Sequence, residues 1–181
     1  MELQTIKDRI PDYAKDLRLN LDAVINRSSL TPTLAAGAAV AAAFAARSPA
    51  LLAALHDDST LDSTHREAAL TAAALMGMNN VWYPFVEMAS DPELKTLRPE
   101  LRMNAYANHG GVDRTSFELY ALAASIVGKC EFCIRSHYQL LRENGFTTQQ
   151  LRDVGRIAAV VNAVAQVFAV EQVEMAESGA A

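Results

Sequence analysis

Apolar residues recur at helical spacing along most of the chain, and the alternation typical of strands is missing. An amphipathic start ends at Pro11, and an alanine-rich stretch follows over about 32–46. Asp62 is a suitable N-cap for a helix that we expect to end near Gly77, where Asn79 would open another. The pattern therefore predicts an all-helical protein. Four conspicuous residues of these central helices are expected in the hydrophobic core: Met76, Met78, Trp82 and Phe85.

The last third of the chain has the strongest helical pattern. Three helices are predicted, over about 114–127, 130–143 and 148–175, with Gly128 ending the first. Residues 157–170 of the last helix are apolar nearly all round. A helix of this kind is buried on most sides, and a second subunit could supply part of that cover.

The chain also carries a weak internal repeat. Gly77 aligns with Gly128, 51 positions later, within segments of about 62–105 and 114–156. Such an alignment is typical of a duplicated helical hairpin in which only the second copy carries the chemistry, although two alanine-rich helices can align by chance. The hypothesis is a single helical domain over residues 1–181, built from two copies of one unit.

Composition and charge narrow the class of partner. The formal net charge is -5 with both signs interspersed, so nucleic acid is not an expected partner. The first residues lack the basic start and apolar stretch of a signal peptide. The longest apolar run, Leu34 to Ala46, is shorter than the roughly 20 residues that span a bilayer. These features predict a cytoplasmic protein that does not associate with membranes.

The only two cysteines, Cys130 and Cys133, are three positions apart. A helix places both on one face, and Gly128 just upstream puts them in the first turn of that helix. Unpaired backbone N–H groups and the helix dipole favour a thiolate there, and the thiolate is the reactive form. Because a secreted disulfide scaffold would scatter several cysteines, the pair is predicted to be a redox dithiol.

His137 and Glu118 are the candidate acid–base residues. His137 lies four positions after Cys133, on the same helical face. If the helices flanking Gly128 form an antiparallel hairpin, Glu118, ten residues before it, approaches His137, nine after it. A carboxylate bonded to one ring nitrogen would leave the other as a base for Cys133. Taken alone, His137 is typical of a surface histidine, and Glu118 of an acid that stabilises a helix N-terminus.

A zinc site and an inert buried cysteine pair are the alternatives. Zinc usually takes four ligands, and Cys130, Cys133 and His137 would supply three of them. The fourth would come from one of His56, His65, His109 and Glu118. The register of the two cysteines with His137 favours the redox interpretation.

These residues form the pattern E-x11-C-x-x-C-x3-H, which is similar to the signature of the alkylhydroperoxidase D family. Other segments resemble the family as well, so the similarity covers nearly the whole chain. They are residues 11–17, 19–21, 74–81, 97–99, 101–104 and 117–119.

The resemblance implies a fold, an activity and partners. The fold would be the all-helical one shared with carboxymuconolactone decarboxylases, assembled as a homotrimer. The activity would be reduction of alkyl hydroperoxides without a bound cofactor. Electrons would come from dihydrolipoamide, the reduced lipoyl group of a 2-oxoacid dehydrogenase E2 component. Dihydrolipoamide dehydrogenase would supply electrons to that lipoyl group. The family is also described as a reducing partner of a peroxiredoxin, the alkyl hydroperoxide reductase C protein.

The resemblance also implies residue roles. Cys133 would attack the peroxide and become a sulfenic acid, and Cys130 would supply a proton and then condense with Cys133 to the disulfide. Glu118 and His137 would form the relay that deprotonates Cys133. One departure is Phe132, which stands where family members carry a relay histidine. Since phenylalanine carries no proton, a redox adaptor that passes electrons to a peroxiredoxin is the competing function.

Overall fold

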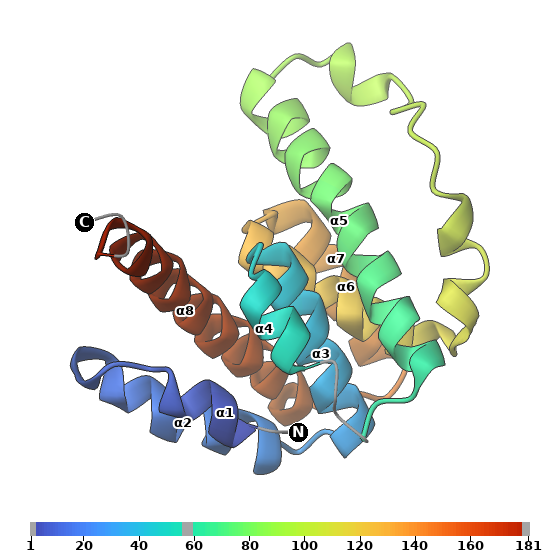
Figure 1. Cartoon of the computed structure of the whole chain (residues 1–181). Helices are drawn as coiled ribbons and strands as arrows, with labels where there is room; N and C mark the ends of the chain where they lie inside the picture. Colours follow the sequence, from blue (N-terminus) through green and yellow to red (C-terminus); the bar gives the residue numbers. More distant parts are fainter. Residues whose placement is uncertain (1–2, 56–59, 179–181) are drawn as a thin grey trace.

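The computed structural model describes residues 3–55 and 60–178, and every regular element in that range is helical (Figure 1). The predicted all-α fold class is therefore confirmed. In chain order the α-helices are α1 (Leu3–Asp8), α2 (Lys15–Asn26), α3 (Pro32–Ala45), α4 (Pro49–Ala54), α5 (Ser63–Ala89), α6 (Arg114–Gly128), α7 (Glu131–Glu143) and α8 (Thr148–Ser178). Short 3-10 helices occupy Asp12–Ala14, Leu94–Thr96, Asn104–Tyr106 and His109–Gly111.

Helices α3, α5 and α6 pack against one another at the centre. Residues 35–43 of α3 are all buried, and all except Val40 are alanine or glycine. Small side chains let neighbouring helix axes approach closely, and Gly37 lies at a close contact between α3 and α6. A Cβ atom there would lie 2.3 Å from Cε1 of the buried Tyr120, so only glycine fits.

The long helix α8 packs on α2, α3 and α6. Asp153 on α8 ties it to the loop before α3, because its Oδ2 accepts hydrogen bonds from Ser29 N at 2.9 Å and Ser29 Oγ at 2.8 Å. Burial raises the pKa of Asp153, but the hydrogen bonds from Ser29, Arg152 and Arg156 lower it by more. The net pKa is well below its usual range. The carboxylate therefore stays charged and holds α8 to the rest of the core.

Residues Thr148–Glu171 of α8 are long and apolar enough to cross a membrane by length and composition alone. In the most apolar 18-residue stretch of this helix, 44% of the residues are buried, so part of the helix packs inside the protein. A core helix passes the same test, and the feature is weak evidence for a membrane span. The prediction that this helix is buried on most sides holds only in part, since Val170 is 53% exposed.

Helix α5 corrects one sequence prediction. Asp62 caps it as expected, by accepting a hydrogen bond from His65 N at 2.8 Å. The predicted end near Gly77 is wrong, because α5 continues without a break to Ala89 and includes Pro84. A Cβ atom at Gly77 would meet nothing within 4 Å, so this glycine marks neither a turn nor a close contact. The duplicated-hairpin hypothesis stays a prediction. In the segment of the proposed first copy, the chain forms the single long helix α5 and not two helices.

The outer half of α5 extends past the other helices, and the chain then returns along it through residues 90–111 (Figure 1). This return segment consists of turns and three short 3-10 helices. It brings Met103 and Tyr106 to the site described below. The two ends of α5 therefore serve different purposes: the inner half packs in the core, and the outer half borders the site.

Candidate active site

The turn between α6 and α7 positions the two cysteines. Helix α6 ends at Gly128, and Lys129 adopts a left-handed conformation with φ 56°. A Cβ atom at Gly128 would lie 2.0 Å from Nδ2 of Asn80 on α5. The same Nδ2 donates a hydrogen bond to Ala124 O at 3.2 Å. Glycine at position 128 thus allows α5 to pack directly against the end of α6, beside Cys130.

Cys130 and Cys133 are joined by a disulfide. Cys130 is the N-cap of α7, and its Sγ accepts a hydrogen bond from Cys133 N at 3.2 Å. A helix N-terminus and a backbone N–H both stabilise a thiolate, so Cys130 is a good leaving group when the disulfide opens. The Cys130 side chain is fully buried, and its Sγ lies 4.0 Å from Asn79 O.

Glu118 and His137 meet across the α6–α7 hairpin. Nδ1 of His137 lies 2.5 Å from Oε2 of Glu118, and Glu118 is 0% exposed. Because an ionised carboxylate only accepts hydrogen bonds, Nδ1 carries the proton and donates. This leaves Nε2 as the basic nitrogen, and it lies 3.3 Å from Met76 Sδ. The geometry is the base-and-orienting-carboxylate arrangement that activates nucleophiles.

Tyr106 is a further member of this cluster. Its hydroxyl donates a hydrogen bond to Oε1 of Glu118, and Arg114 Nε lies 3.8 Å from the same oxygen. Burial raises the pKa of Glu118, but hydrogen bonds from His137 and Tyr106 outweigh it, and the net pKa is lowered from 4.5. Burial and the adjacent carboxylate raise the pKa of Tyr106, which therefore stays protonated and keeps donating.

A pocket of about 150 Å³ lies against this cluster. Helix α7 contributes Phe132, Cys133 and His137 to its wall, and α5 contributes Met76 and Tyr83. Cys133 is 3% exposed and is the cysteine that lines the pocket. A small molecule that enters would therefore meet the sulfur of Cys133 and the ring of His137 together.

The four predicted site residues lie in one region: Cys130 and Cys133 share the disulfide, His137 lines the pocket with Cys133, and Glu118 holds His137. Tyr106 and Tyr83 are members that sequence reasoning missed. Both come from parts of the chain whose contact with α7 depends on tertiary packing, so no spacing signal pointed to them.

One prediction of a core position needs correction. Met76 is buried as expected, and it also contacts His137 and lines the pocket. Phe85 was expected in the core and is 49% exposed, and it lies in the last two turns of α5, close to its end at Ala89. Met78 and Trp82 are half-buried.

The two other described histidines, His65 and His109, do not complete a zinc site with the cysteines. Nδ1 of His65 lies 2.7 Å from the hydroxyl of Tyr120, and the ring of His109 lies 6.0 Å from that of Tyr106. His56 lies outside the described residues. Within the described part of the chain, no group of three or more His, Cys, Asp or Glu residues is placed to hold a metal ion.

Fold and site together define an all-helical protein with a CxxC disulfide at a small pocket, beside a buried carboxylate–histidine pair. Comparison with known proteins gives a family consistent with this class. Residues 92–174 match the carboxymuconolactone decarboxylase family.

Several relatives are similar over almost their whole length. An alkyl hydroperoxide reductase AhpD from Rhodospirillum centenum is 42% identical, over 99% of this chain and 97% of its own. The protein of that name from Maricaulis maris is 43% identical, over 94% of this chain and 99% of its own. The chain belongs to the alkyl hydroperoxide reductase AhpD family.

Proposed function

We propose that this chain reduces alkyl hydroperoxides through a dithiol–disulfide cycle of Cys130 and Cys133. The observation that carries the proposal is the pocket shared by Cys133 and His137, with His137 held by buried Glu118 at 2.5 Å. This neighbourhood supports the roles of nucleophile for Cys133, base for His137 and orienting carboxylate for Glu118. The relatives' printed name, alkyl hydroperoxide reductase, supports the same reaction.

The oxidative half-reaction begins with proton transfer. In the reduced protein His137 takes the Cys133 proton at Nε2, and Glu118 stabilises the imidazolium that forms. The Cys133 thiolate attacks the terminal peroxide oxygen, the O–O bond breaks, and Cys130 protonates the departing alkoxide to give the alcohol. The Cys130 thiolate then attacks the Cys133 sulfenic acid. The disulfide forms, and the released hydroxide takes the His137 proton to give water.

The reductive half-reaction needs an external dithiol, for which we propose dihydrolipoamide carried by a 2-oxoacid dehydrogenase E2 component. One lipoyl thiolate attacks Cys133, the cysteine that lines the pocket, and displaces Cys130 as a thiolate. The Cys133 N–H bonded to Cys130 Sγ at 3.2 Å supports this choice of leaving group. The second lipoyl thiol then attacks the mixed disulfide, which restores Cys133 and leaves oxidised lipoamide. No bound cofactor is needed.

The proposed setting is a cytoplasmic homotrimer, each chain one domain with a duplicated helical unit, that also reduces a peroxiredoxin. Exposed apolar residues support assembly: Met88 on the outer half of α5 is 78% exposed, and Val170 on α8 is also uncovered. Burying such residues against other copies would remove apolar surface from water.

Reduction of the disulfide by dihydrolipoamide tests the electron donor. The oxidised protein should be reduced faster by dihydrolipoamide than by glutathione at equal thiol concentration, because the second lipoyl thiol resolves the mixed disulfide intramolecularly. Alkylation of the freed cysteines, followed by mass spectrometry, gives both rates. Equal rates for the two reductants would contradict a dedicated lipoyl donor.

A redox adaptor for a peroxiredoxin is the second candidate, and Phe132 favours it. This side chain occupies the relay-histidine position and packs on the ring of Tyr83 at 4.3 Å, so it transfers no proton. Hydroperoxide consumption measured with and without the peroxiredoxin separates the two functions. Turnover that requires the peroxiredoxin would favour the adaptor.

A further inference from the structure

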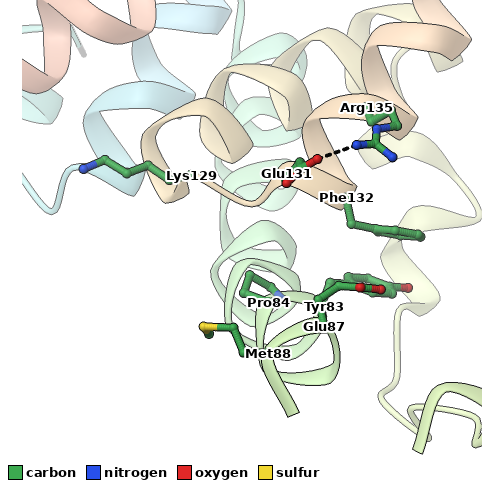
Figure 2. A pocket seen from close by; sticks show the side chains of 8 residues that line it. All are labelled: Tyr83, Pro84, Glu87, Met88, Lys129, Glu131, Phe132 and Arg135. Carbon is green, nitrogen blue, oxygen red and sulfur yellow. Dashed lines mark hydrogen bonds and ion pairs between the residues drawn. The ribbon is translucent and has the colours of Figure 1, made fainter. Parts of the chain in front are cut away.

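Tyr83 and Phe132 form a stacked aromatic pair at the mouth of the site. Tyr83 comes from α5, and Phe132 lies between the two cysteines on α7. Their ring centroids are 4.3 Å apart with an interplanar angle of 21°. Figure 2 shows the Phe132 ring lying over Tyr83, with Pro84 and Met88 alongside on α5.

The pair is shared by two pockets. The inner pocket of about 150 Å³ reaches Cys133 and His137. The outer one, of about 360 Å³, lies on the surface and is also lined by Met88, Lys129 and Arg135 (Figure 2). Because Tyr83 and Phe132 belong to both walls, the stacked rings separate the outer pocket from the one at Cys133.

The inner pocket has the size of a site for a compact organic group. Tyr83, Phe132, Met76 and Met103 supply aromatic and thioether faces to its wall, and Asn79, Ser136 and His137 supply polar groups. A cavity of about 150 Å³ is large enough for a molecule the size of benzene. Cys133 lies in the same wall, so an organic group seated there would present its peroxide oxygens to the sulfur.

We propose that the inner pocket binds the organic group of the hydroperoxide, and that Tyr83 and Phe132 make it selective for compact aryl and branched alkyl hydroperoxides. This rests on the proposed peroxidase function and adds its substrate class. Hydrogen peroxide has no group to fill the pocket and gains no contact energy. A long-chain hydroperoxide exceeds the inner volume, and the stacked pair blocks its extension into the outer pocket.

Substrate competition between variants tests the selectivity. The ratio of kcat/KM for cumene hydroperoxide to that for a linoleic acid hydroperoxide is measured for the wild type, Tyr83→Ala and Phe85→Ala. Losing one aromatic contact should lower the ratio roughly 5- to 10-fold in Tyr83→Ala. Phe85 is an exposed aromatic residue of the same helix that lines neither pocket, so Phe85→Ala should keep the wild-type ratio. An unchanged ratio in Tyr83→Ala would overturn the proposal.

A second readout does not depend on peroxidase turnover. Cumyl alcohol, the product of cumene hydroperoxide reduction, should slow alkylation of Cys133 by iodoacetamide in the reduced wild type and in Phe85→Ala, but not in Tyr83→Ala. Equal alkylation rates with and without the alcohol in the wild type would overturn the pocket assignment. If cumyl alcohol slows alkylation of Cys133 in a wild type that consumes none of the hydroperoxides, the assignment of the pocket stands and only the peroxidase function is refuted.

Discussion

Replacing Glu118 by glutamine should reduce hydroperoxide turnover at neutral pH by about 10²-fold, the lower range for loss of a general-base function. The reason is the 2.5 Å contact between Glu118 Oε2 and His137 Nδ1. Glutamine can accept the same hydrogen bond, but it has no charge to stabilise the imidazolium formed when His137 takes the Cys133 proton. The measurement is the rate of iodoacetamide alkylation of reduced Cys133 as a function of pH. The pH at which this rate rises should be higher in the variant than in the wild type.

The sign of a second pH effect follows from the same carboxylate. The pKa of Glu118 in the folded protein is lowered from 4.5, so its contribution to stability is fully present above that pH and is lost as the pH falls through the lower folded value. Glu118→Gln should lack this loss of stability at acid pH. Tyr106→Phe is the control with an intermediate effect, since it removes one hydrogen-bond donor to Glu118 and keeps the charge of the carboxylate. An unshifted alkylation profile in Glu118→Gln would exclude Glu118 from the mechanism.

A Cys130→Ser variant should trap the first intermediate. When the reduced protein receives one equivalent of cumene hydroperoxide without a donor, the wild type should lose two hydrogens and form the disulfide. The variant should instead gain one oxygen atom at Cys133, because serine cannot resolve the sulfenic acid. Serine is also a preferred N-cap, so it should keep the α7 start that Cys130 provides through Cys133 N. Mass spectrometry distinguishes the two products.

The site of the added oxygen is the decisive result of that experiment. Peptide mapping should place it on Cys133, which lines the pocket with His137. In the matched Cys133→Ser variant, Cys130 should remain a thiol, because its side chain is fully buried. An oxygen found on Cys130 would reverse the two assigned roles.

The contact between Glu118 and His137 could be anticipated because it is nearly local. Helix caps and Gly128 indicated a hairpin, and the two residues lie at nearly equal distances from its turn, ten positions before Gly128 and nine after it. The α6, α7 and α8 boundaries followed from the same capping signals, with α7 beginning one residue after its cap, Cys130. Short-range chemistry of this kind is readable because backbone geometry alone determines which residues meet.

Tyr106, Tyr83 and the course of α5 were not anticipated, for a different reason. Tyr106 lies in a segment of turns with no periodicity, and it reaches Glu118 only because the chain folds back along α5. Gly77 looked like a helix end, although the helix formers around it carry α5 through. These features depend on packing between distant segments, which no local pattern encodes.

Consumption of cumene hydroperoxide with dihydrolipoamide as electron donor, compared between the wild type and Cys133→Ser, tests the central claim most directly. The account predicts sustained turnover in the wild type and only the background rate in the variant. Equal turnover in both proteins would contradict Cys133 as the reacting sulfur. A wild type that consumes no hydroperoxide, while dihydrolipoamide still reduces its disulfide, would contradict the peroxidase function and leave the adaptor role.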